Sequence, residues 1–166
     1  MILSQGVSKA IFNYYGNLIV SGSKDGTVKI WDITSGLCIS TFSGEFAEIT
    51  GVDINEVGDQ LIFATKSSTN VLMDMRMKRV LKRFRGHQNS TRHFVDVSFG
   101  PAPGLLVGGS EDGRVCMWNM ATGELDRTLD GHQGPVYSTA WSPTRSMLAS
   151  CSEDGSIRLW NKGAVA

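Results

Sequence analysis

The chain has 166 residues, a length typical of one domain, and it combines 41% hydrophobic with 19% charged residues at a formal net charge of zero. This composition excludes a disordered chain, which would be less apolar and more highly charged, and it excludes a globally basic nucleic-acid-binding domain. No apolar run approaches the roughly 18 residues that a membrane-spanning helix needs.

Glycine and cysteine give two further constraints. The chain contains 19 glycines but only 4 prolines, which favours many tight turns between short strands. The three cysteines, Cys38, Cys116 and Cys151, are far apart and form no C-x-x-C motif. We expect free, buried thiols in a reducing compartment.

A ten-residue pattern recurs along the chain, at residues 23–32, 65–74, 110–119 and 152–161. The last residues of these copies, Asp32, Asp74, Asn119 and Asn161, are 42, 45 and 42 positions apart. The three extra residues of the longer interval fall between Gly86-His87 and Phe94. The sequence therefore predicts one domain of repeats, at approximately 1–43, 44–85, 86–130 and 131–166.

Each repeat is predicted to form four short strands. Residues 7–32 align without a gap on residues 136–161, and residues 94–101 match residues 136–143. In the last repeat, residues 136–141, 147–152 and 157–160 have the composition of strands, and an Asp-Gly turn joins the last two. Residues 124–129 predict the fourth strand. No amphipathic helix is evident, so we expect an all-β fold.

These motifs identify a family resemblance. The last repeat resembles the WD-repeat (WD40) β-propeller family, whose period is about 40–45 residues. The residues that carry the resemblance are Gly131-His132 and the sequence Ser-Glu-Asp-Gly-Ser-Ile-Arg-Leu-Trp-Asn at 152–161. Gly86-His87 with residues 110–119, and residues 23–32, repeat the match, so the resemblance covers residues 7–161. It implies four-stranded antiparallel blades that pack face to face around a central channel.

The resemblance also implies a buried series of hydrogen bonds in each well-formed blade, from the His after Gly through a Ser or Thr and the turn Asp to the third-strand Trp. The residues carried over by position are His87, Ser110, Asp112 and Trp118 in the third repeat; His132, Asp154, Trp160 and either Ser150 or Ser152 in the fourth; and Asp25 and Trp31 in the first.

The first two repeats depart from this pattern. Leu3 stands at the histidine position of the first repeat, and Glu45, Ser67 and Met73 replace the His, Asp and Trp of the second. The second repeat must then rely on apolar packing, and we expect it to be the least protected of the four against amide exchange.

The combination of His, Ser and Asp also occurs in hydrolytic triads. A triad is a single constellation in one cleft, whereas these residues recur at the repeat interval together with a Trp. No phosphate-binding loop, paired-carboxylate motif or metal-ligand spacing accompanies them. We therefore expect a structural role, no enzyme activity, no cofactor and no metal.

The number of repeats raises a question of closure, because WD-repeat propellers typically have seven or so blades. We expect an incomplete ring, either the C-terminal part of a larger propeller or a truncated product without autonomous function. An open arc exposes blade faces and a strand edge, so self-association of two arcs into one ring is a further hypothesis.

Two surfaces are candidates for interaction. One is a basic strand at the outer edge of the second repeat. Its charges either prevent edge-to-edge pairing with another sheet or form a site for an anionic ligand or nucleic acid. Its residues are Arg76, Lys78, Arg79, Lys82, Arg83 and Arg85. The other is the inserted loop at residues 88–93, with Gln88, Asn89, Arg92 and His93, which either binds a protein or merely spans a wider gap.

The function predicted from the sequence is a non-enzymatic scaffold for protein–protein interaction, with rim loops presented to protein partners in a multiprotein assembly. Binding of an anionic ligand or nucleic acid through residues 76–85 is the alternative. Unpaired cysteines and the absence of an evident export signal predict a cytoplasmic or nuclear location.

Overall fold

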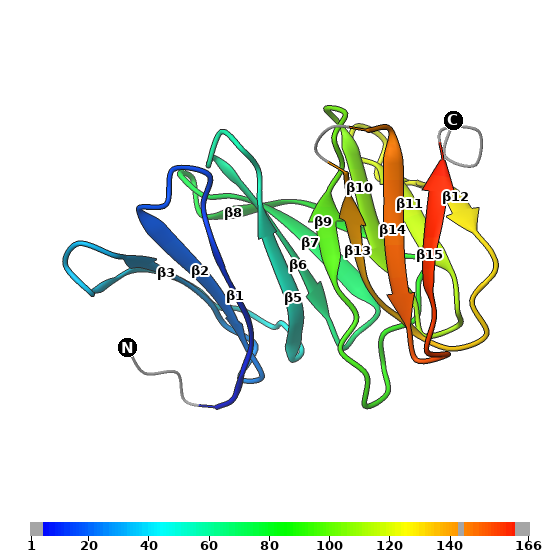
Figure 1. Cartoon of the computed structure of the whole chain (residues 1–166). Coiled ribbons are helices and arrows are strands. Elements are labelled where there is room, and N and C mark those ends of the chain that lie inside the picture. Colours follow the sequence, from blue (N-terminus) through cyan, green and yellow to red (C-terminus); the bar gives the residue numbers. More distant parts are fainter. Residues whose placement is uncertain (1–4, 143–144, 162–166) are drawn as a thin grey trace.

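The computed structural model describes residues 5–142 and 145–161, which form fifteen β-strands and no helix (Figure 1). The strands are β1 (Val7–Phe12), β2 (Leu18–Ser23), β3 (Val28–Asp32), β4 (Cys38–Phe42), β5 (Ile49–Ile54), β6 (Gln60–Thr65), β7 (Thr69–Asp74), β8 (Arg79–Phe84), β9 (Val97–Phe99), β10 (Leu105–Gly109), β11 (Val115–Asn119), β12 (Leu125–Leu129), β13 (Val136–Trp141), β14 (Met147–Ser152) and β15 (Ile157–Asn161). The all-β prediction is confirmed.

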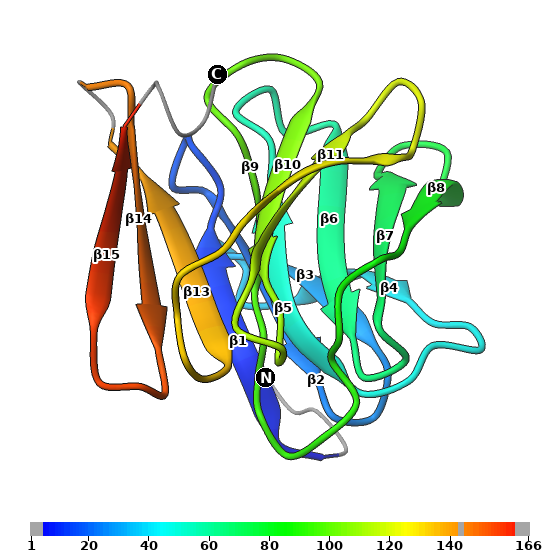
Figure 2. The ribbon, with the colours of Figure 1, turned by 90° about the vertical axis from the view of Figure 1, so that its right-hand side faces the viewer.

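The strands form four antiparallel sheets in chain order, which are the blades of a propeller (Figures 1 and 2). Blade 1 contains β1–β4, blade 2 contains β5–β8 and blade 3 contains β9–β12, whereas the described part of blade 4 contains β13–β15. Within each blade, every strand pairs with the next one along the chain, as the family resemblance implied. Among the described residues, each blade packs mainly against the blade that precedes or follows it in the sequence. The first strands of the blades, β1, β5, β9 and β13, form most of these contacts.

The hairpins between the second and third strands of blades 1, 3 and 4 each contain an Asp-Gly dipeptide, whereas blade 2 has Ser67-Ser68 at this turn. Gly113 and Gly155 have φ values of +85° and +78°, which only glycine adopts without steric cost. The preceding aspartate accepts a hydrogen bond from the backbone two residues on, as Asp154 does from Ser156 N at 2.9 Å. The turn sequence thus sets the register of the second and third strands of a blade.

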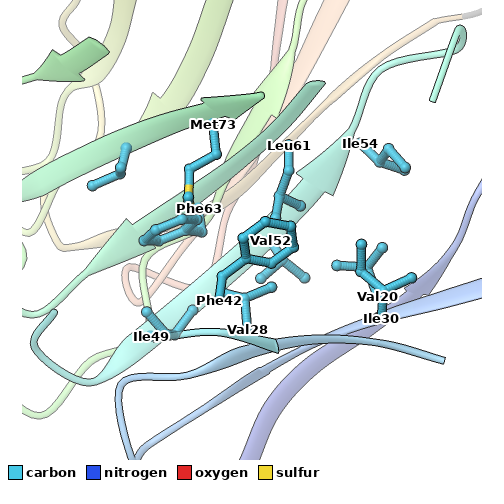
Figure 3. Close-up of a cluster of buried hydrophobic side chains, with 11 residues drawn as sticks. Val20, Val28, Ile30, Phe42, Ile49, Val52, Ile54, Leu61, Phe63 and Met73 are labelled. Atoms are coloured by element: carbon cyan, nitrogen blue, oxygen red, sulfur yellow. The ribbon is translucent and has the colours of Figure 1, made fainter. Parts of the chain in front are cut away.

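The hydrophobic core lies between the blades. Figure 3 shows the cluster between blades 1 and 2, in which Val20 and Phe42 of blade 1 face Val52, Leu61 and Phe63 of blade 2. A second cluster joins blades 2 and 3, and a third joins blades 3 and 4. The buried apolar clusters of this chain thus join one repeat to the next, as in other repeat proteins.

A polar centre links the innermost strands. The Asp96 carboxylate, just before β9, forms an ion pair with Lys9 of β1 and accepts a hydrogen bond from Ser138 Oγ of β13 at 3.3 Å. Asp53 at the end of β5 accepts a hydrogen bond from the backbone N–H of Phe99 at 2.9 Å. These contacts connect blade 3 to blades 1, 2 and 4 around the central axis.

The structure bears on the expectations for the cysteines and for Leu3. All three cysteines are free, but Cys38 is exposed on β4, so the expectation that all three are buried is wrong. The position of Leu3 lies outside the described residues. The described chain includes no helix of the length and apolarity that a membrane crossing requires.

The burial of blade 2 leads us to expect slow amide exchange, the reverse of the order expected from its missing polar residues. Blade 2 has a neighbour on both faces, and Leu61 and Ile62 are fully buried, whereas Ile157 and Leu159 of β15 are 74% and 66% exposed. Amides at 61–72 should therefore exchange more slowly than those at 148–159 in a native-state hydrogen-exchange measurement. Faster exchange at 61–72 would restore the earlier expectation.

The exposed apolar residues of β15 could pack against a second copy of the chain, so self-association stays a prediction. Sedimentation of the purified chain measures its oligomeric state directly.

Candidate interaction sites on the two rims

Blade 4 contains a continuous series of hydrogen bonds. The buried imidazole of His132 contacts Asp154 Oδ2 through Nδ1 at 2.9 Å and Ser150 Oγ through Nε2 at 2.8 Å. Trp160 Nε1 donates to the same Ser150 hydroxyl at 2.9 Å. Of the two serines considered for this position, Ser150 takes part, whereas the Ser152 hydroxyl donates to the carbonyl oxygen of Gly134. Hydrogen bonds from Ser156 and Gln133 lower the pKa of Asp154 below its usual range.

Blade 1 has a shorter version of this series. Trp31 Nε1 donates to Ser21 Oγ at 2.8 Å, and Ser21 occupies the position equivalent to Ser150. The Asp25 carboxylate accepts hydrogen bonds from the backbone N–H and the hydroxyl of Thr27. Trp31 is thus held by the Ser21 hydroxyl and Asp25 by Thr27, and the two pairs are separate.

Blade 3 differs from the expected series. His87 is buried beside Trp118, with the ring centroids 5.3 Å apart, but neither ring nitrogen has a hydrogen-bond partner among the described residues. Trp118 Nε1 donates instead to the carbonyl oxygen of Arg85 at 2.8 Å. The reason is Gly108, which stands where blades 1 and 4 have Ser21 and Ser150 and supplies no hydroxyl.

The turn aspartate of blade 3, Asp112, also has a different partner from its counterpart in blade 4. The Asp112 carboxylate forms an ion pair with Arg114, whose Nε lies 2.8 Å from Asp112 Oδ2, at the position where blade 4 has Ser156. The Ser110 hydroxyl accepts a hydrogen bond from the backbone N–H of Gln88 at 2.9 Å. Asp112 and Ser110 therefore stabilise the turn and the adjoining loop rather than His87.

The two buried histidines should respond oppositely to replacement. We expect His132→Leu to lower the free energy of unfolding by about 2 kcal/mol or more, because it removes the buried imidazole that joins the Ser150 hydroxyl to the Asp154 carboxylate. His87→Leu should be neutral or stabilising, because it replaces a buried imidazole that forms no hydrogen bond with an apolar side chain. Urea unfolding of both variants measures this difference, and equal losses would contradict the geometry.

His87 should also make stability depend on pH. Burial lowers the pKa of His87 from 6.5 to about 4, against a smaller opposing effect of Asp112. As the pH falls, His87 is therefore protonated in the unfolded chain before it is protonated in the folded one. The free energy of unfolding is highest above pH 6.5 and decreases toward pH 4, by about 3 kcal/mol in total. Denaturant unfolding at pH 7.5 and 4.5 should show a smaller loss for His87→Leu than for the wild type. An identical loss would show that His87 does not contribute.

The inserted loop is held in place by residues of two blades. Glu111 Oε1 and Oε2 accept hydrogen bonds from the backbone N–H groups of Thr91 and Ser90 at 3.0 and 2.9 Å. Although burial alone would raise the pKa of Glu111, these hydrogen bonds and Lys66 lower it. Lys66 donates to the carbonyl oxygen of His93. Neither Glu111 nor Lys66 was predicted from the sequence, since an acid in a hairpin and a lone lysine are common surface residues.

The candidate binding residues of the loop have different roles. Asn89 is fully buried and donates through Nδ2 to Thr50 Oγ1 at 2.8 Å, so its side chain is structural and the expectation that it contacts a partner is wrong. Gln88 is exposed, and the Arg92 side chain is 86% exposed. His93 Nδ1 lies 3.4 Å from the Tyr137 hydroxyl.

A hollow of about 450 Å³ lies beside this loop. Its lining residues are Arg92, His93, Phe94, Tyr137 and Glu153. Lys24 Nζ and Lys66 Nζ lie 4.9 and 5.2 Å from the centre of the Phe94 ring. The hollow thus combines aromatic rings with charges of both signs, which suits recognition of a protein surface.

The basic strand is only partly available. Arg76, Lys78, Arg79 and Arg85 are exposed on β8 and its flanking turns. Lys82 donates to the carbonyl oxygen of Ala121 in blade 3, and the Arg83 guanidinium lies 5.6 Å from the centre of the Phe46 ring. Because Lys82 contacts blade 3 and Arg83 contacts the connection before β5, the strand contributes to packing as well as to surface charge.

No group of three or more His, Cys, Asp or Glu side chains within the described ranges is placed to hold a metal ion. The His, Ser and Asp residues that could suggest a triad recur from blade to blade, and His132, Ser150 and Asp154 of blade 4 are bound to one another and to Trp160 in a buried series.

Comparison with known proteins agrees with this architecture. The family model described as "WD domain, G-beta repeat" matches residues 4–32, 78–119 and 123–161. These matches cover most of the chain, so the chain belongs to the WD40 repeat family. The unmatched residues 33–77 include β5–β7 of blade 2, where Glu45, Ser67 and Met73 replace the family residues.

Several curated proteins are similar to the chain. It is 30% identical to the periodic tryptophan protein 2 homolog of Dictyostelium discoideum over 142 residues, which is 84% of this chain and 15% of that protein. It is 29% identical to WD repeat-containing protein 82 of Drosophila melanogaster over 140 residues, 81% of this chain and 44% of that protein. It is 26% identical to pre-mRNA-processing factor 19 of Bos taurus over 136 residues, 81% of this chain and 27% of that protein. The chain therefore spans less than half of these relatives.

Proposed function

We propose that this chain is a non-enzymatic scaffold that binds a partner protein through the rim formed by the inserted loop. Membership of the WD40 repeat family supports an interaction role in a multiprotein assembly. The observation that carries the proposal is the loop itself, a backbone anchored by Glu111 and Lys66 beside a hollow with exposed charged side chains. Free cysteines support a location in the cytoplasm or nucleus.

The anchoring favours binding over a purely space-filling role for the loop. The Glu111 side chain is only 5% exposed, and its carboxylate accepts hydrogen bonds from the N–H groups of two consecutive loop residues. A loop that only spanned a wider gap would not need such a buried carboxylate. Because the backbone of residues 90–93 is already ordered, a partner loses little free energy in ordering it.

The partner surface should complement both charges of the hollow. Arg92 Nη2 and Glu153 Oε1 lie 3.9 Å apart and form an exposed ion pair, so charged groups of a partner can reach both side chains. Phe94, which is 38% exposed, offers an apolar contact between them. An aromatic or aliphatic anchor flanked by polar groups fits this site.

Site-directed photo-crosslinking tests the proposal. A photoreactive amino acid at position 92 should give crosslinked partner bands in cells, and the same probe at exposed position 79 of the basic strand should give none of those bands. The Glu153→Lys variant should reduce the crosslinks from position 92 severalfold, because it removes the negative half of the site.

The control distinguishes the two candidate surfaces. Crosslinks found only from position 79, and not formed when a lysate is irradiated at high salt, would favour the anionic-ligand alternative and contradict the proposed one. Circular dichroism of each variant checks that the fold is retained, which is expected because Arg92, Glu153 and Arg79 are exposed.

A further inference from the structure

The geometry points to a second binding site on the opposite rim, a groove that takes a basic peptide segment of a partner protein, with a Lys or Arg flanked by apolar side chains. The groove has a volume of about 680 Å³. Its principal lining residues are Asp53, Glu56, Val57, Phe99, Pro101 and Trp141. It lies among the connections that follow β5, β9 and β13.

The two sites are at opposite ends of the same strands. The inserted loop precedes β9, whereas the connection that lines the groove follows β9, so the length of this inner strand separates them. Figure 2 shows the green connection from β8 to β9 at the lower end and the connection from β9 to β10 at the upper end. A partner in the groove would therefore leave the inserted loop free.

The walls of the groove are ordered before any ligand binds. Asn55 Oδ1 accepts hydrogen bonds from the N–H groups of Gly58, Asp59 and Gln60 at 3.0–3.1 Å, which closes the turn after β5. The hydrogen bond from Phe99 N to Asp53 joins this wall to blade 3. Proline at position 101 further restricts the facing loop. A groove with fixed walls has a lower entropic cost of binding than a mobile one.

The charge of the groove defines the ligand. Asp53 and Glu56 line it, and none of the described residues of its lining is Lys, Arg or His. Lys9 is close enough to Asp53 to lower its pKa, but burial has the larger effect and raises it, and the Lys9 ammonium is paired with Asp96. A cationic side chain in the groove would thus gain from two carboxylates, one of them largely desolvated.

The apolar lining defines the flanking residues. Val57 is 69% exposed, and Pro101, which also lines the groove, is exposed as well, so both offer apolar surface to a ligand. The partly buried rings of Phe99 and Trp141 add aromatic surface for a guanidinium or an aliphatic chain. A volume of 680 Å³ accommodates a few side chains, which fits a short segment.

Selection from a phage library of random dodecapeptides tests this site on the full chain. We expect enrichment of sequences in which Lys or Arg is flanked by apolar residues. The strongest selected peptide, labelled with fluorescein and measured by anisotropy, should bind Glu56→Lys at least about tenfold more weakly, because the exposed carboxylate becomes a repulsive ammonium. Val57→Ser, which keeps the charge, should weaken binding through the apolar flank.

Arg92→Glu on the other rim is the matched control and should leave the affinity unchanged. Enrichment of acidic or uncharged sequences, or an affinity unaffected by Glu56→Lys, would overturn the inference. Loss of binding in Arg92→Glu would overturn it too, because it would place the peptide at the inserted loop. The two proposals fail separately, since each has its own charge-reversal variant.

Discussion

Every blade of this protein is a sheet with two faces, and a sheet buries both of them only if a neighbour packs on each side. The arrangement in chain order follows from this constraint, as do the three apolar clusters between blades. Small residues permit the close approach: a Cβ at Gly22 would lie 2.6 Å from a methyl group of Ile49 in the next blade. Blade 2, covered on both sides, needs no polar series of its own.

The polar contacts near the axis orient the blades that the apolar clusters hold together. Asp96 contacts Lys9 of blade 1 and Ser138 of blade 4, while Asp53 of blade 2 binds the backbone at Phe99 of blade 3. The side chain of Asp96 also needs Gly51, where a Cβ would lie 2.2 Å from its Oδ1. Because charged hydrogen bonds are directional, these contacts fix how the loops on both rims are presented.

The hairpin hydrogen bonds are local and vary from blade to blade without changing the fold. Blade 4 connects His132, Ser150 and Trp160 through one hydroxyl, and blade 1 keeps the tryptophan–serine part. Blade 3 loses the hydroxyl at Gly108, where a Cβ would lie 2.8 Å from the carbonyl oxygen of Asp96. The close approach of the neighbouring strand therefore excludes the serine that His87 would need.

The repeat interval, the Asp-Gly turns and the third-strand tryptophans were sufficient to predict the blades, because turn geometry and strand alternation depend on residues close in sequence. The partners of Asp96 and the burial of Asn89 could not be predicted, since each joins side chains from different repeats. The contact of Glu111 with the inserted loop lies within one repeat, but it joins residues about twenty positions apart and depends on how the loop folds back on the hairpin. The groove could not be predicted either, since its walls come from three separate connections. Local chemistry thus determined the strands, and only the packing of one blade against the next decided which side chains meet.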